Sequence, residues 1–165
     1  MTVNAYIELL MKSKIVTGLA PITPSSSTPD YVSVKDYARA TIILLVDNGT
    51  TVTGSAITVK QATAVAGTGE KAVEFDWVYV NTDTGASDTL VKTAVTSDTF
   101  TTDTTNAKNL LYVIEIDVAA QLDIDNSFDC LRVGTGNGAN MVLAALYVLH
   151  PGMHNPSIAV SAITD

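Results

Sequence analysis

Short runs rich in Val, Ile, Leu and Thr, each closed by turn residues, recur along most of this chain. Apolar and acidic side chains alternate in residues 73–79, and a similar alternation occurs in residues 110–117. Such period-2 patterns are typical of half-buried strands, and Val and Thr favour strands over helices. Weaker or more continuous apolar runs are predicted as strands at residues 40–46, 57–63, 90–96, 99–102, 128–133 and 141–149.

Seven or eight strands with turns every 8–12 residues or so predict an antiparallel β-sandwich of the jelly-roll type. No strand–helix–strand alternation is visible, which argues against a parallel α/β sheet. Asp117 is a good N-cap residue, so one helical turn is expected between residues 117 and 123. The predicted core includes Val73, Phe75, Trp77, Tyr112, Ile114, Leu143 and Leu146.

The first thirty residues lack the strand patterns that mark the rest of the chain. Residues 4–16 show helical periodicity, with Glu8 and Lys12 four apart, and Pro21–Pro29 has the composition of an extended linker. We therefore expect an N-terminal helix or extended arm over residues 1–30, and a sandwich domain over residues 31–165. The apolar arm residues predicted to contact another copy or another protein are Leu9, Leu10, Ile15, Val16 and Leu19. The alternative is that this segment packs back on its own sandwich.

Composition excludes several classes of protein. The chain has 165 residues, 9 basic and 17 acidic, and a net charge of −8, which argues against binding nucleic acid. No apolar run approaches the roughly 20 residues of a membrane-spanning helix, so no membrane partner is expected. One cysteine excludes an internal disulfide framework. The early Glu8 and the lack of a basic leader argue against a secretory signal and for an intracellular origin.

Candidate metal and nucleophile sites fail on spacing or context. His150 and His154 lie four apart, but Pro151 and Gly152 between them disfavour a helix. Cys130 lies in a predicted strand without a supporting motif. Acids alternate in residues 123–129, yet the Gly and Glu of a calcium-binding EF-hand loop are missing, so only a looser calcium site remains open.

Candidate phosphate and glycosidase sites fail in the same way. Gly134–Gly138 lacks the spacing and the following helix of a phosphate loop. Glu70, Glu74 and Asp76 could supply a carboxylate pair, but exposure on a strand face is the simpler interpretation. The sequence therefore predicts no catalytic site, no metal site and no cofactor, and a protein that is not an enzyme.

Three segments resemble small virion proteins of tailed bacteriophages that serve as capsid decoration or cement proteins. They are residues 36–49, 112–133 and 139–149. The resemblance implies a structural protein, made in the cytoplasm of the host bacterium, that binds the outside of the capsid shell. Its implied partners are the major capsid protein and further copies of itself, in a trimer or, less favoured, a dimer. It implies no active site.

The alternative function is a carbohydrate- or receptor-binding β-sandwich module of a virion. Such modules commonly present an exposed aromatic side chain to a sugar. Trp77 is the only tryptophan and is predicted to lie in the core, so this platform is not evident from the sequence.

Overall fold

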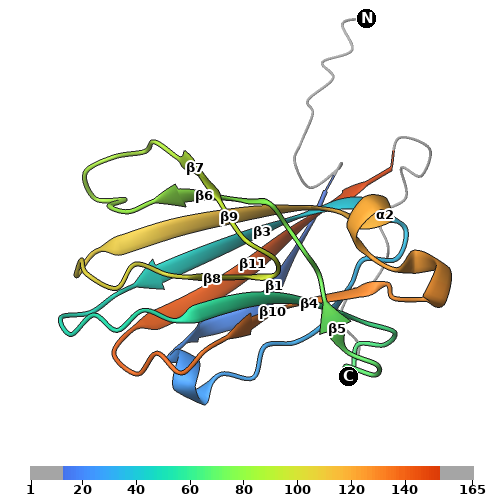
Figure 1. Ribbon diagram of the computed structural model, residues 1–165, viewed down its shortest axis with the longest axis horizontal. Coiled ribbons are helices and arrows are strands. Elements are labelled where there is room, and N and C mark those ends of the chain that lie inside the picture. The colour runs from blue at the N-terminus through green and yellow to red at the C-terminus, as the bar shows by residue number, and fades with distance from the viewer. Residues whose placement is uncertain (1–12, 153–165) are drawn as a thin grey trace, which may run out of the picture.

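The computed structural model describes residues 13–152 and shows an all-β, antiparallel protein with two sheets packed on each other (Figure 1). This confirms the predicted all-β, antiparallel sandwich. The six-stranded sheet has the order β1 (Lys14–Ile22), β11 (Val142–Pro151), β3 (Tyr37–Asp47), β9 (Asn109–Asp117), β6 (Trp77–Asn81), β7 (Val91–Ala94). The other sheet has the order β2 (Val32–Ser33), β10 (Cys130–Thr135), β4 (Ala56–Ala62), β5 (Lys71–Ala72), with β8 (Thr99–Thr101) also on β4.

Helical structure is confined to three short turns within the described residues. These are η1 (Pro24–Ser26), α2 (Val118–Gln121) and η2 (Ile124–Asn126). The carboxylate of Asp117 accepts a hydrogen bond from the Ala120 N–H at 3.0 Å, which confirms the predicted capped turn. Over residues 13–152, no helix has the length and apolarity needed to cross a membrane.

The core lies between the two sheets and is filled by alternate residues of each strand. On β9 the buried residues are Leu110, Tyr112, Ile114 and Ile116, as the period of two predicts. Among the other predicted core residues, Val73, Phe75 and Leu143 are also buried.

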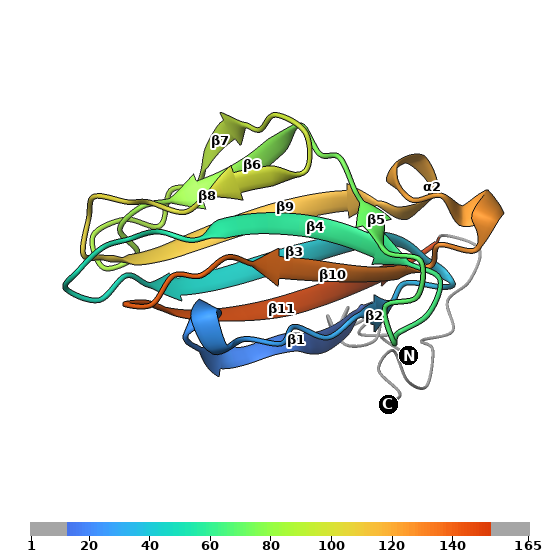
Figure 2. The same ribbon diagram turned by 60° about the horizontal axis from the view of Figure 1, so that its bottom comes forward.

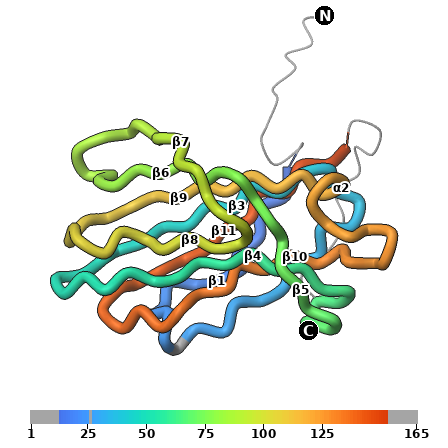
Figure 3. Tube along the Cα trace, in the orientation of Figure 1, coloured from blue at the N-terminus to red at the C-terminus, as the bar shows by residue number. Residues whose placement is uncertain are grey.

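Trp77 and Leu146 correct the predicted core. Trp77 is 45% exposed, and Leu146 is half-buried on the opposite face of β11 from Leu143. Only residues 77–79 of the predicted strand over residues 73–79 lie in a strand, β6, because residues 73–76 carry the chain from β5 in one sheet to β6 in the other (Figure 3). After this crossing, Val78 rather than Trp77 faces the core.

The N-terminal segment also needs correction. Residues 14–16, predicted as helical, belong to strand β1, which pairs with β11 at the edge of the six-stranded sheet (Figure 2). Val16 and Leu19 are buried in the core of their own chain, so the sandwich begins well before residue 31. The prediction for Leu9 and Leu10 falls outside the described residues.

Candidate functional site: the outer face of the six-stranded sheet

The six-stranded sheet is apolar on both of its faces. On β3 the inward residues Ile42 and Leu44 are buried, and the outward residues Ile43 and Leu45 are also apolar. The same holds for β9 and β11, where almost every residue from 110 to 114 and from 141 to 149 is apolar. Continuous apolar strands are typical of sheets that are covered on both sides.

The strand register brings the outward apolar residues into rows across the sheet. Leu146 pairs with Ile43, Ile43 with Val113, and Val113 with Tyr79. A second row runs from Ala144 through Leu45 to Leu111. We call this surface the outer face, and its apolar residues are Ile15, Ile43, Leu45, Tyr79, Leu111, Val113, Val142, Ala144, Leu146 and Val148.

Large side chains on the outer face are open to solvent. Leu45 is 48% exposed, Ile15 44% and Val142 42%. They lie on three neighbouring strands, β3, β1 and β11, and the half-buried residues Ala144, Leu146 and Val148 of β11 lie between Val142 and Ile15. Monomeric soluble proteins rarely leave large continuous apolar patches open, and such patches mark interaction sites.

The opposite side of the molecule is polar by comparison. On the five-stranded sheet, Lys60 of β4 pairs with Arg132 of β10, and both contact the carboxylate of Glu70. The hydroxyl of Tyr31 also donates to Glu70, and the hydrogen bond from Lys60, followed by that from Tyr31, lowers the pKa of this carboxyl group. The contrast between the two sheets singles out the outer face as the candidate functional surface.

Polar residues border the outer face at both ends of its strands. At one end, Arg39 lies 3.6 Å from the Glu115 carboxylate. Beside it, the His150 ring hydrogen-bonds the hydroxyls of Ser13 and Thr41, each at 3.1 Å. Burial, and then the charge of Arg39, lower the pKa of His150, which favours the neutral ring. An apolar centre with a polar rim is the usual anatomy of a protein–protein interface.

An acidic residue, Asp47, lies at the other end of the same strands. There Asp47 of β3 pairs with Asn109 of β9 and with Val142 of β11. Asp47 is exposed, and its side chain accepts a hydrogen bond from the Gly49 N–H at 3.0 Å.

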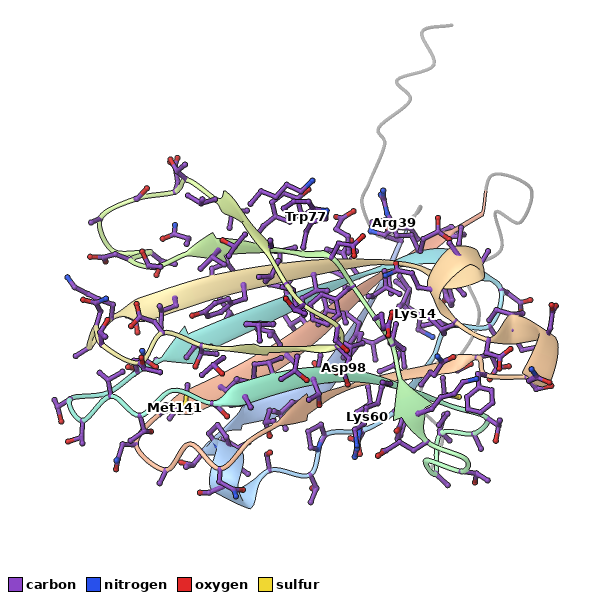
Figure 4. All side chains as sticks on the ribbon, in the orientation of Figure 1. Lys14, Arg39, Lys60, Trp77, Asp98 and Met141 are labelled. Atoms are coloured by element: carbon purple, nitrogen blue, oxygen red, sulfur yellow. The ribbon has the colours of Figure 1, made fainter. Side chains whose placement is uncertain are left out.

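A groove of about 380 Å³ adjoins the outer face on β6 and β9 and includes Trp77 and Tyr79. Its polar lining comes from Glu74, Asp76, Glu115, Asp117 and Gln121. The Lys92 ammonium lies 4.2 Å from the centre of the Trp77 ring. In Figure 4, Trp77 and Arg39 project from the upper margin of the molecule, outside the space between the sheets.

The other candidates weighed from the sequence are engaged in structural contacts. Cys130 is buried, and burial followed by the neighbouring Asp129 raises the pKa of its thiol to about 12, which makes a nucleophilic thiolate unfavourable. Asp123 forms an ion pair with Lys71 and accepts hydrogen bonds from Asn126. His154 lies outside the described residues. Over residues 13–152, no three His, Cys, Asp or Glu side chains are grouped as metal ligands would be.

The outer face was not identified from the sequence, although a signal for it was present. The continuous apolar runs at residues 110–114 and 141–149 indicate coverage on both sides, whereas one folded sandwich covers only one side. Comparison of the chain with protein-family models, with curated proteins and with solved structures gives no match.

Proposed function

We propose that this chain is a structural virion protein of a tailed bacteriophage, which binds the outside of the capsid shell and stabilises it. The observation that carries the proposal is the outer face, an extended apolar surface of the kind that a subunit of a larger assembly covers with a neighbouring subunit. The three segments that resemble phage virion proteins contain all of β3 and most of β9, β10 and β11. Of these, β3, β9 and β11 build the outer face, so the resemblance and the candidate surface fall on the same part of the chain.

The jelly-roll type of sandwich forms part of this proposal. Successive strands cross from one sheet to the other between β3 and β4, between β9 and β10, and between β10 and β11. The strand β3 pairs with β9 in one sheet while β4 pairs with β10 in the other, so two sheet-crossing connections run side by side. Paired crossings of this kind support a jelly-roll arrangement.

A decoration role needs only modest affinity at each site. A capsid offers many equivalent positions, and an oligomer that touches several of them gains avidity. In this proposal the partners are the major capsid protein and further copies of the chain, and the location is the capsid surface. The protein is not an enzyme in this role.

Sedimentation with intact capsids tests the proposal. We expect the purified chain to co-sediment with capsids that lack it, at a fixed number of copies per capsid, and to raise the temperature at which the capsids release DNA. Capsids of an unrelated phage provide the control. If the chain stays in the supernatant with its own capsids at micromolar concentrations, the proposal is wrong.

The exposure of Trp77 favours a second candidate, a saccharide-binding module. An aromatic ring beside the carboxylates of Asp76 and Glu115 could stack on a sugar while the carboxylates accept hydrogen bonds from its hydroxyls. Because Trp77 is the only tryptophan, its fluorescence reports directly on this groove. A saturable spectral shift with a glycan that Trp77→Ala fails to bind on an array would favour this candidate. Leu90→Ala, at a side chain of similar exposure outside the groove lining, is the matched control.

A further inference from the structure

We propose that the outer face packs against the outer face of a second copy of this chain, around a two-fold axis that lies in the interface and runs across the strands. The inference rests on the proposed function only for the expectation of a homo-oligomer. The choice of face, the symmetry and the contact residues are argued from the structure.

The outer face approaches the size of a standard dimer interface. Five strands, from β1 to β6 in sheet order, spaced by about 4.8 Å, give a width of about 20–24 Å. Residues 142–148 of β11 extend over about 20 Å at 3.4 Å per residue. The apolar centre therefore covers roughly 400–500 Å², and with its polar rim it approaches the roughly 800 Å² per partner of a standard interface.

The shape of the surface also suits a second sheet. Outward side chains of a sheet form a layer that can interdigitate with another such layer about 10 Å away, as in the core of a sandwich. A second copy supplies a sheet with the same spacing and the same apolar rows.

The direction of the axis is inferred from two exposed residues of opposite charge, Arg39 and Asp47, which lie near the two ends of the outer side of β3. A two-fold axis across the strands reverses their direction, so the Arg39 end of one copy lies over the Asp47 end of the other. An axis along the strands would place like charges together. The midpoint between Arg39 and Asp47 on β3 is Ile43, which belongs to the apolar row of Leu146, Val113 and Tyr79. The axis that places Arg39 over Asp47 therefore runs along a row that is apolar on β11, β3, β9 and β6, and that ends in Thr17 on β1 and Lys92 on β7.

The same arrangement places the interface symmetrically on the sheet. An axis across the strands preserves their order, so β3 packs over β3 of the second copy. Two strands, β1 and β11, lie on one side of β3, and three strands, β9, β6 and β7, lie on the other. The central strand of the apolar area therefore lies at the centre of the dimer, which is the self-complementary contact that an isologous interface requires.

Sedimentation velocity on the full chain measures the proposed association. We expect the wild-type protein to be dimeric at micromolar concentrations, and Leu45→Lys to weaken dimerisation at least about 100-fold, because it places an unpaired charge in the apolar centre. Ile124→Lys is the matched control: Ile124 is 42% exposed, close to the 48% of Leu45, but lies on η2 outside the outer face. A dimer that Leu45→Lys leaves intact overturns the proposal.

Exchanging the charges of Arg39 and Asp47 tests the direction of the two-fold axis. Both side chains are exposed in the folded monomer, so the substitutions should not disturb its core. Arg39→Asp and Asp47→Arg should each weaken the dimer about 5- to 30-fold, since each change acts twice around the axis. The double variant should return to within about 3-fold of the wild type. Additive weakening in the double variant overturns the proposed axis. Circular dichroism confirms that each variant is folded.

The remaining outcomes separate this inference from the proposed function. A wild-type chain that is monomeric at 100 μM, while Leu45→Lys abolishes capsid binding, overturns the second copy as occupant and identifies the capsid protein instead. A monomer in which Leu45→Lys has no effect on capsid binding also overturns it. A dimer with the expected variant behaviour that binds no capsid supports the inference and removes the decoration role.

Discussion

At the scale of single residues, Tyr147 connects the two sheets by one hydrogen bond. Its hydroxyl, on β11, accepts from the Val133 N–H of β10 at 2.7 Å, and both residues are buried. Burial raises the pKa of the Tyr147 hydroxyl far above its ordinary value, and the hydrogen bond from Val133 opposes this only weakly, so the hydroxyl stays protonated at any physiological pH. The ring also fills the space beside Gly18, where a Cβ atom would lie only 2.0 Å from a ring carbon.

Replacing Tyr147 by Phe should lower the free energy of unfolding by about 1–3 kcal/mol. The change leaves the ring packing in place but removes the hydroxyl that accepts a hydrogen bond from the buried Val133 N–H. Urea unfolding measures the difference. Tyr79→Phe, at a half-buried position on the outer face, should change it by less than about 0.5 kcal/mol. Equal effects of the two substitutions would contradict the assigned role of Tyr147.

Asp103 should make stability depend on pH in the acid range. Burial would raise its pKa, but hydrogen bonds from Asn106 and from the Thr105 N–H outweigh burial and lower the pKa to about 2. A lowered folded pKa stabilises the fold above the unfolded value near 4, and this stability is lost as the pH falls through 2.

The Asp103→Asn variant isolates this contribution. At pH 7 it should be less stable than the wild type by about 1–2 kcal/mol, after allowance for solvent screening. The difference should shrink between pH 4 and pH 2, because the wild-type carboxylate becomes protonated. Thermal unfolding of both proteins from pH 2 to pH 7 measures this, and a difference that is constant with pH would contradict it.

At the scale of elements, strand β1 is part of the sandwich, so substitutions in β1 should affect the stability of the fold. Leu19 is 7% exposed and packs in the core, whereas Ile15 is 44% exposed on the outer face. Leu19→Ala should therefore lower the free energy of unfolding by about 2–4 kcal/mol, and Ile15→Ala by less than about 1 kcal/mol. Chemical unfolding of dilute, monomeric protein measures both. Near-zero effects at both positions would instead support a free arm.

Strand patterns predicted from the sequence are correct where a single strand stays in one sheet. Leu110, Tyr112, Ile114 and Ile116 alternate over one uninterrupted strand, so the period of two identified their buried face. Trp77 was misplaced because the chain changes sheets after β5, and a sheet change resets which alternate residues face the core. Nothing local in residues 73–77 marks that change, since it is decided by pairing with the distant strand β9.

The outer face was not predicted from the sequence either, because what covers a strand is decided outside that strand. A continuous apolar run such as residues 141–149 indicates that both sides of a strand are covered, but it does not distinguish coverage within one chain from coverage by another. Leu146 was therefore placed in the core, although its side of β11 faces away from the second sheet. The continuous apolar run is explained if a second molecule covers the outer face.

At the scale of the whole molecule, charge and apolar area act in opposite directions on association. The chain carries a net charge of −8, so two copies repel each other at long range. The outer face instead favours association through apolar burial, which salt does not weaken. The rim pairs between Arg39 and Asp47 are exposed and contribute only about 0.2–1 kcal/mol each.

Salt should therefore strengthen the dimer. Raising NaCl from 10 to 150 mM shortens the Debye length from about 30 Å to about 8 Å, which screens repulsion between the two acidic bodies while leaving apolar contacts unchanged. We expect the dimer dissociation constant to fall by about 10-fold over this range, and then to change little up to 0.5 M. Sedimentation equilibrium at several salt concentrations measures it. Weakening with salt would instead assign the association to ionic contacts, and Leu45→Lys would then leave the dimer largely intact.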